Sequence, residues 1–184
     1  MPNDLMRKLS CFIFITFILI SCNNQNKKNA ESFFYAANDR LKNVPEKIDS
    51  IIINQCISDY TNAIKLNPKF WQAYRNRAGL YADIKQFKKA INDLTTALQY
   101  ADKNSAINLH DMRAYSYYGL QYYDKAIQDW TIAVDNLANP SFALLQRAKA
   151  RWMSGHKAKA CEDYKKVVQL DKTLDEKKEF LKCE

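Results

Sequence analysis

Four segments of this chain repeat one pattern of side chains at a nearly constant spacing. They start at Cys56, Ala90, Ala126 and Ala160, so successive copies are 34, 36 and 34 residues apart. Each copy reads small residue, apolar residue or Cys, polar residue, Asp and large apolar residue, followed after two spacers by a small or branched residue and an aliphatic one. Because apolar positions recur every three or four residues, each segment is predicted to be an amphipathic helix. A period of this length indicates a repeat array.

A second helical pattern precedes each of the last three copies, over residues 71–81, 107–117 and 141–151. Each carries an alanine near its middle: Ala78, Ala114 and Ala148. Two helices can approach closely only where one of them offers no bulk, so these alanines are expected at helix crossings. The chain has 3 Gly and 4 Pro in 184 residues, too few for the many turns of an all-β fold. The sequence therefore predicts an all-α fold of helix-turn-helix repeats.

Three stretches carry a resemblance to a known family. Residues 73–78 (Ala-Tyr-Arg-Asn-Arg-Ala), 87–94 (Phe-Lys-Lys-Ala-Ile-Asn-Asp-Leu) and 63–68 (Ala-Ile-Lys-Leu-Asn-Pro) resemble the tetratricopeptide repeat, whose second helix is stopped by a proline. The resemblance covers about residues 46–171. It implies a helical solenoid of about three full repeats, preceded by a degenerate repeat or capping pair. Residues 173–182 are expected to form a capping helix with a polar outer face.

The chain departs from the family pattern in two places. Alanine stands at the middle of the first helices, where the family often has glycine. The third repeat is expected to be entered through a longer loop, at residues 100–105.

Charged residues recur in register with the repeat. Aspartates occupy equivalent positions on the second helices: Asp59, Asp93, Asp129 and Asp163. Arginines occupy equivalent positions on the first helices: Arg77, Arg113 and Arg147. The two rows predict partly buried ion pairs that fix the helix packing, and each Arg could meet the Asp of its own repeat or of the preceding one. The alternative is that the Arg row binds an acidic ligand.

The N-terminus has the features of a targeting signal. Arg7 and Lys8 precede an apolar run of 12 residues at positions 9–20. A membrane-spanning helix takes about 20 residues, so this run fits a secretory signal better. It ends in Leu-Ile-Ser-Cys at residues 19–22, which resembles the bacterial lipobox. The resemblance implies that residues 1–21 are removed and that Cys22 carries a lipid. The alternative is an ordinary cysteine after a signal peptide or a short membrane anchor.

The resemblance also implies a domain organisation and a location. Residues 22–29 are mostly Asn, Gln and Lys, and we expect them to be a flexible tether before a helical domain at residues 30–184. No Asp follows Cys22, so the signal that retains some bacterial lipoproteins in the inner membrane is absent. We therefore expect a lipid-anchored protein of the bacterial cell envelope, at the outer membrane, in a leaflet that the sequence leaves open.

The remaining cysteines favour structural roles. Cys56 occupies a small-residue position and is predicted to be a buried thiol. Cys161 and Cys183 are predicted to form a disulfide, because an exported chain meets oxidising conditions and the cap should pack on the last repeat. The alternative is two free thiols.

No residue pattern suggests a reaction. The chain has no cysteine and histidine spacing of a zinc site, and it lacks phosphate-loop, metalloprotease and nucleophile-elbow motifs. We expect no enzymatic activity, cofactor, metal or small-molecule substrate. The net charge is +8, but six acidic residues interrupt the lysines of residues 157–182. This indicates a solvated surface and not a nucleic-acid site.

What remains is a binding surface. In the resembled family the first helices line a concave groove that receives a peptide or a helix. Side chains that do not serve the core predict the groove: Gln72, Arg75, Asn76, Asn108, Asp111, Met112, Tyr115, Tyr118, Phe142, Leu145, Gln146, Lys149 and Trp152. Four aromatic residues among them are typical of protein-binding hot spots.

The predicted function is a membrane-anchored interaction module that binds a peptide or helical segment of an envelope partner. Two alternatives stay open. One is a structural or assembly subunit of an outer-membrane or secretion complex that docks by another surface. The other is binding of anionic polymers or lipid head groups by the Lys-rich C-terminal end, which would depend steeply on salt.

Overall fold

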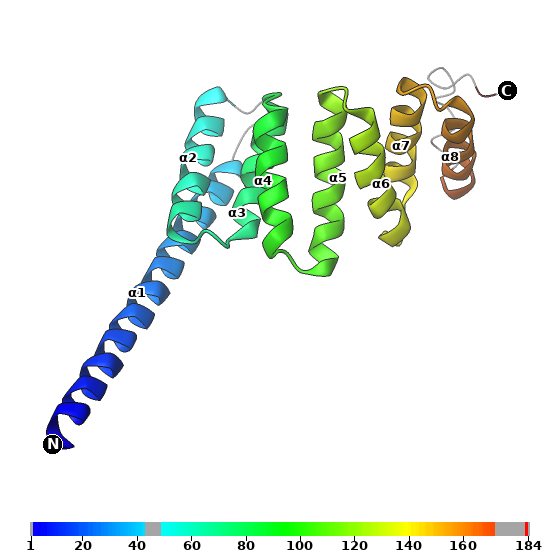
Figure 1. The fold of residues 1–184 in the computed structure, drawn as a ribbon. Coiled ribbons are helices and arrows are strands. Elements are labelled where there is room, and N and C mark those ends of the chain that lie inside the picture. The colour runs from blue at the N-terminus through cyan, green and yellow to red at the C-terminus, as the bar shows by residue number, and fades with distance from the viewer. Residues whose placement is uncertain (1, 43–48, 172–182, 184) are drawn as a thin grey trace. The chain divides into compact units, whose positions relative to one another are not determined.

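The computed structural model describes residues 2–42, 49–171 and 183. Within these residues all regular structure is helical (Figure 1). The helices are α1 (Pro2–Lys42), α2 (Ser50–Leu66), α3 (Trp71–Asp83), α4 (Phe87–Tyr100), α5 (Lys103–Gly119), α6 (Tyr123–Asn136), α7 (Ser141–Met153) and α8 (Lys157–Leu170). The prediction of an all-α fold of helical hairpins is confirmed. The predicted capping helix at residues 173–182 lies outside the described residues.

The chain divides into two compact units, residues 1–73 and 74–184. In the first unit the C-terminal half of α1 packs against α2. The Phe34 ring lies 5.8 Å from the ring of Tyr60 and 4.8 Å from that of Phe70. Cys56 is fully buried, and its Sγ lies 3.6 Å from the Ala37 carbonyl oxygen. Burial raises the pKa of the Cys56 thiol, as for a cysteine that serves the core.

Helix α1 continues through the segment expected to be a flexible tether. Residues 22–29 are helical and exposed, and Gln25 Nε2 donates a 3.0 Å hydrogen bond to Asn29 Oδ1 one turn later. Gln and Lys are good helix formers, so a polar composition alone does not exclude a helix here. Among the described residues, no helix combines the length and apolarity needed to cross a bilayer. Removal of residues 1–21 stays a prediction.

In the second unit each helix from α4 to α7 packs against the helix that follows it (Figure 1). The alanines expected at helix crossings, Ala78, Ala114 and Ala148, are buried. The largest fully buried side chain is Trp130 on α6. The unit is therefore built by close approach of helices at small residues, with the large aromatic side chains of Trp130 and Tyr164 buried in two core clusters.

The turn inside each hairpin of this unit has one backbone feature in common. Lys85, Gln121 and Gly155 each lie two residues after the end of a first helix, and their φ angles are 58°, 62° and 87°. This left-handed region favours glycine, which only the third turn uses. Equivalent geometry with different residues shows that the repeat, and not the local sequence, sets the turn.

The predicted loop at residues 100–105 is wrong. Helix α5 begins at Lys103, because Asp102 caps it and accepts hydrogen bonds from the backbone N–H groups of Asn104 and Ser105 at 3.0 and 2.9 Å. An aspartate at this position satisfies amide groups that have no partner within the helix. The extra residues of the third repeat therefore lengthen a helix instead of a loop.

Candidate functional site

The two charged rows form ion pairs within each hairpin. Arg147 Nε and Nη2 each donate to one oxygen of Asp163 at 2.8 Å, in a two-pronged arrangement. Arg113 meets Asp129 in the same way at 2.7 and 2.8 Å. Each Arg therefore pairs with the Asp 16 residues later, on the second helix of its own repeat. This decides the pairing register that the sequence left open.

The other hydrogen-bond donors of these arginines reach the preceding repeat. Arg113 Nη1 donates to Thr95 Oγ1, and Arg147 Nη1 donates to Thr131 Oγ1, both at 3.2 Å. The hydrogen bonds to Asp129 raise the pKa of Arg113 against the opposing effect of burial. These side chains hold neighbouring hairpins together, which favours a structural role over acidic-ligand binding.

The first repeat pairs in the same way, and the N-terminal pair has a related contact at a different spacing. Arg77 Nε and Nη2 contact Asp93 at 2.8 and 2.7 Å. Burial would lower the pKa of Arg77, but the hydrogen bonds and charge of Asp93 outweigh it and the pKa is raised. In the first unit Asp59 pairs with Arg40 of α1 at 3.2 Å. Arg40 was not predicted as the partner of Asp59, because the two residues are 19 positions apart instead of 16.

A hollow of about 220 Å³ opens over the first helix of each hairpin in the second unit, α3, α5 and α7. We call this hollow the groove. Its lining comes from α3 to α7: Ala78, Gly79, Ala82, Asp83, Leu94, Asp111, Met112, Tyr115, Ser116, Trp130, Phe142 and Gln146. Five of these residues were predicted from the sequence: Asp111, Met112, Tyr115, Phe142 and Gln146. The small residues of α3, whose lack of bulk leaves the hollow open, were not predicted, and neither was Trp130, which comes from a second helix.

Two aromatic rings project from the groove lining into solvent. Tyr115 is 55% exposed and Phe142 is 62% exposed. Below them Trp130 is buried, and its Nε1 donates a 2.9 Å hydrogen bond to Asp111 Oδ1. The groove thus has an apolar floor, an aromatic rim and a polar anchor. Such a combination suits the side chains of a bound protein segment.

The charge of the groove is negative. Asp83 and Asp111 are the charged residues of its lining. Burial raises the pKa of Asp83. Burial also raises the pKa of Asp111, and the hydrogen bond from Trp130 only partly offsets this.

Several predicted groove residues lie elsewhere. The prediction that Leu145 lines the groove is wrong, because its side chain is 5% exposed and packs with Tyr164 and Val167 between α7 and α8. Tyr118 is half-buried, with its ring 5.8 Å from that of Trp130, and Trp152 is half-buried against the same core as Leu145. The other predicted residues do not line the groove: Gln72, Arg75, Asn76, Asn108 and Lys149.

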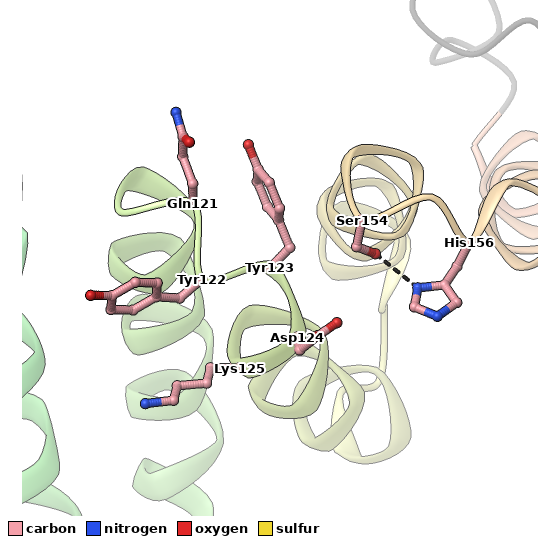
Figure 2. Close-up of a pocket in the computed structure, with 7 residues that line it drawn as sticks. All are labelled: Gln121, Tyr122, Tyr123, Asp124, Lys125, Ser154 and His156. Carbon is pink, nitrogen blue, oxygen red and sulfur yellow. Dashed lines mark hydrogen bonds between the residues drawn. The ribbon is translucent and has the colours of Figure 1, made fainter.

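A second, larger hollow of about 630 Å³ lies between the α5–α6 and α7–α8 turns (Figure 2). Its residues are Gln121, Tyr122, Tyr123, Asp124, Lys125, Ser154 and His156. Figure 2 shows the Tyr122 side chain directed away from the turn that holds Ser154 and His156. Ser154 Oγ lies 2.9 Å from His156 Nδ1, but no described residue orients the imidazole from its other side, as a nucleophilic triad requires. Among the described residues, no three potential ligands gather into a metal site.

The structure joins Cys161 of α8 to Cys183 by a disulfide with an S–S distance of 2.01 Å. Cys183 also packs against the core cluster of α7 and α8. Cys22 is an exposed free thiol on α1.

No family model matches the chain. A stretch of 85 residues, 41% of the chain, is 35% identical to sperm-associated antigen 1 of Homo sapiens, and it spans 9% of that protein. Several crystal structures resemble the fold, and two of them are YrrB and MamA. YrrB, a TPR protein with an unusual peptide-binding site, has a TM-score of 0.67 and 20% identity, over 80% of this chain and 72% of that one. MamA has a TM-score of 0.69 and 16% identity, over 84% and 78%.

The fold is of the tetratricopeptide-repeat type. At identities of 16% and 20% these similarities establish the fold alone. The function of this chain must therefore be inferred from the residues of its groove.

Proposed function

We propose that this tetratricopeptide-type chain is a protein-interaction module that binds a peptide or helical segment in the groove. The observation that carries the proposal is the pair of exposed aromatic rings, Tyr115 and Phe142, above a hollow that the chain does not fill. Exposed aromatic side chains around a desolvated pocket are the usual anchors of protein recognition. YrrB, which shares the fold, is described as having a peptide-binding site. The proposed role is binding without catalysis.

The test is affinity capture from solubilised envelopes with the native chain and with a Tyr115→Ala, Phe142→Ala variant. Both residues are exposed, so the variant should remain folded, as circular dichroism can verify. Tyr122→Ala is the matched control, because Tyr122 is a 49% exposed aromatic residue outside the groove. A protein lost with the groove variant and kept with Tyr122→Ala supports the proposal. A set of proteins that is the same for all three contradicts it.

The second hollow supports a different candidate, an assembly subunit that docks through its turns. Tyr122 and Lys125 are exposed there, and Lys125 Nζ lies 5.5 Å from the Tyr122 ring. Loss of the captured protein with Tyr122→Ala, and its retention with the groove variant, would favour this candidate. Capture that survives both sets of substitutions but is lost at raised salt would favour the Lys-rich C-terminal end.

We further propose that the module is held at the bacterial outer membrane by a lipid on Cys22. The Leu-Ile-Ser-Cys sequence supports this, as does the exposure of Cys22. More than one acyl chain is needed for stable anchoring, which lipoprotein processing would supply. Cys22→Ser should leave the uncleaved chain without lipid, and mass spectrometry of the native and variant proteins measures this. A native chain that keeps residues 1–21 and carries no lipid would contradict the anchor and leave the groove proposal untouched.

A further inference from the structure

The two aspartates of the groove differ from those of the ion-pair row. Asp93, Asp129 and Asp163 each face an Arg at 2.7 or 2.8 Å. Asp111 is half-buried, and among the described residues its side chain is bonded to the Trp130 indole alone. Asp83 is the last residue of α3, and it forms no ion pair with any of the described residues.

The groove is therefore acidic on a basic chain. Its lining holds two carboxylates and no Lys, Arg or His, although the chain as a whole carries a net charge of +8. Because random placement of charge would favour a basic groove, the absence of a basic lining residue distinguishes this surface from the rest of the chain. The field at the groove attracts cations and repels acidic segments.

The unpaired carboxylate of Asp111 has capacity for a ligand. A carboxylate offers about four acceptor positions, and the Trp130 indole N–H occupies one. A partly buried charge without a counter-charge is costly, and a cation that arrives with a ligand would remove that cost. The raised pKa of Asp111 is consistent with a charge that burial disfavours in the unoccupied groove. An Arg or Lys side chain would supply the missing donors.

The apolar part of the groove adds a second requirement. Tyr115, Phe142 and Met112 line the same hollow of about 220 Å³ as Asp111. A volume of this size accommodates one large side chain but not a folded domain. An apolar side chain of the ligand can therefore enter between the rings while a neighbouring cation pairs with Asp111.

We propose that the groove selects a basic protein segment in which Arg or Lys lies beside an aromatic or branched apolar residue. The apolar side chain fills the space between Tyr115 and Phe142, and the cation pairs with Asp111, with Asp83 adding to the attraction. This proposal rests on the proposed function, since it names the chemistry of the segment that the groove binds.

The test presents a random displayed-peptide library to the purified full-length chain in detergent. Selected peptides are then measured by fluorescence anisotropy against four variants: Asp111→Asn, Asp83→Asn, Asp135→Asn and the double Tyr115→Ala, Phe142→Ala. Asn keeps the acceptor for Trp130 and removes the charge. Asp135 is an exposed aspartate of α6 outside the groove and serves as the matched control.

Three outcomes separate the two proposals. Both proposals are supported if the selected peptides carry Arg or Lys beside an apolar residue, and if Asp111→Asn reduces their affinity about tenfold while Asp135→Asn leaves it unchanged. Peptides that lose binding in the Tyr115, Phe142 variant, yet show no basic preference and no effect of Asp111→Asn, overturn the charge selectivity and leave the binding groove in place. Peptides that bind regardless of Tyr115 and Phe142, or a library without binders, overturn the groove function itself.

Discussion

The buried ion pair between Arg147 and Asp163 should be the most sensitive polar contact of the second unit. The two side chains are 7% and 2% exposed, and they share two hydrogen bonds of 2.8 Å. Arg147→Met keeps much of the side-chain volume and removes the charge, which leaves Asp163 with Arg151 at 2.6 Å as its remaining cation. Breaking one side of a buried pair costs about 3–5 kcal/mol. Because Arg151 stays in place, we expect the lower part of that range.

The same reasoning sets two controls. Replacing both partners, by Arg147→Met with Asp163→Leu, should restore part of the lost stability, because the buried carboxylate that lost its Arg147 partner is then also removed. In the first unit Arg40 and Asp59 are 43% and 15% exposed, so Arg40→Met should cost only about 0–1 kcal/mol.

Urea unfolding followed by circular dichroism at pH 7 measures all of these values. The slope of the transition must stay constant for the comparison to hold. A cost below about 1 kcal/mol for Arg147→Met would refute the reasoning, because it would mean that this pair contributes no more than an exposed one. A double variant much less stable than the single one would also contradict it.

Four further substitutions test other parts of the structure by the same unfolding measurement. A Cβ on Gly119 would lie 2.6 Å from the Phe87 ring, so Gly119→Ala should destabilise the fold by about 1–3 kcal/mol. A Cβ on Gly79 would meet only Met112, at 3.8 Å, so Gly79→Ala should be neutral or stabilising. Equal effects of the two substitutions would contradict the close approach of Gly119 to Phe87. Gly155→Ala places alanine at a φ of 87°, which should cost about 1–2 kcal/mol without any steric contact, and an unchanged midpoint would argue against the left-handed turn. Burial raises the pKa of the Asp111 carboxyl in the folded state above its usual 3.8. The neutral carboxyl therefore contributes to the stability of the fold below pH 3.8, and this contribution is lost as the pH rises through the raised pKa. Asp111→Asn should therefore gain stability relative to the native chain at pH 7 and match it at about pH 3, and a difference independent of pH would disprove the shift.

The repeat could be predicted because each helix obeys a local rule. Small residues at one position and Asp at another recur every 34 or 36 residues, and both positions face the packing surface. The type of ion pair followed from the two charged rows. Its register did not, because the choice between the Asp of the same hairpin and that of the preceding one depends on how the hairpins stack, which no single helix encodes.

The groove was predicted only in part for a similar reason. Tyr115 and Phe142 could be identified from their helical positions, but Leu145 has the same apolar character and packs inward. Phe142 and Leu145 are three residues apart, which places their side chains about 60° apart around the helix axis, so a modest rotation of α7 decides which one faces the groove. Trp130 belongs to a second helix and reaches the floor from below, where helical periodicity of the first helices gives no signal.

Local capping chemistry explains the other difference. Asp102, Asn104 and Ser105 look like loop residues by composition, and the same residue types are favoured at helix starts. Here the Asp102 side chain accepts hydrogen bonds from Asn104 and Ser105, so the helix begins at Lys103. Reading the Asp as a cap would have given the correct boundary.

The most direct test of the groove as the binding surface is photo-crosslinking in intact cells. A benzoylphenylalanine replaces Phe142 in one chain and Tyr122 in another, since both residues are exposed aromatics. If the groove binds the partner, a discrete protein adduct forms from position 142 and is absent from position 122. Adducts from position 122 with none from position 142 would contradict groove binding and would place the docking surface at the turns.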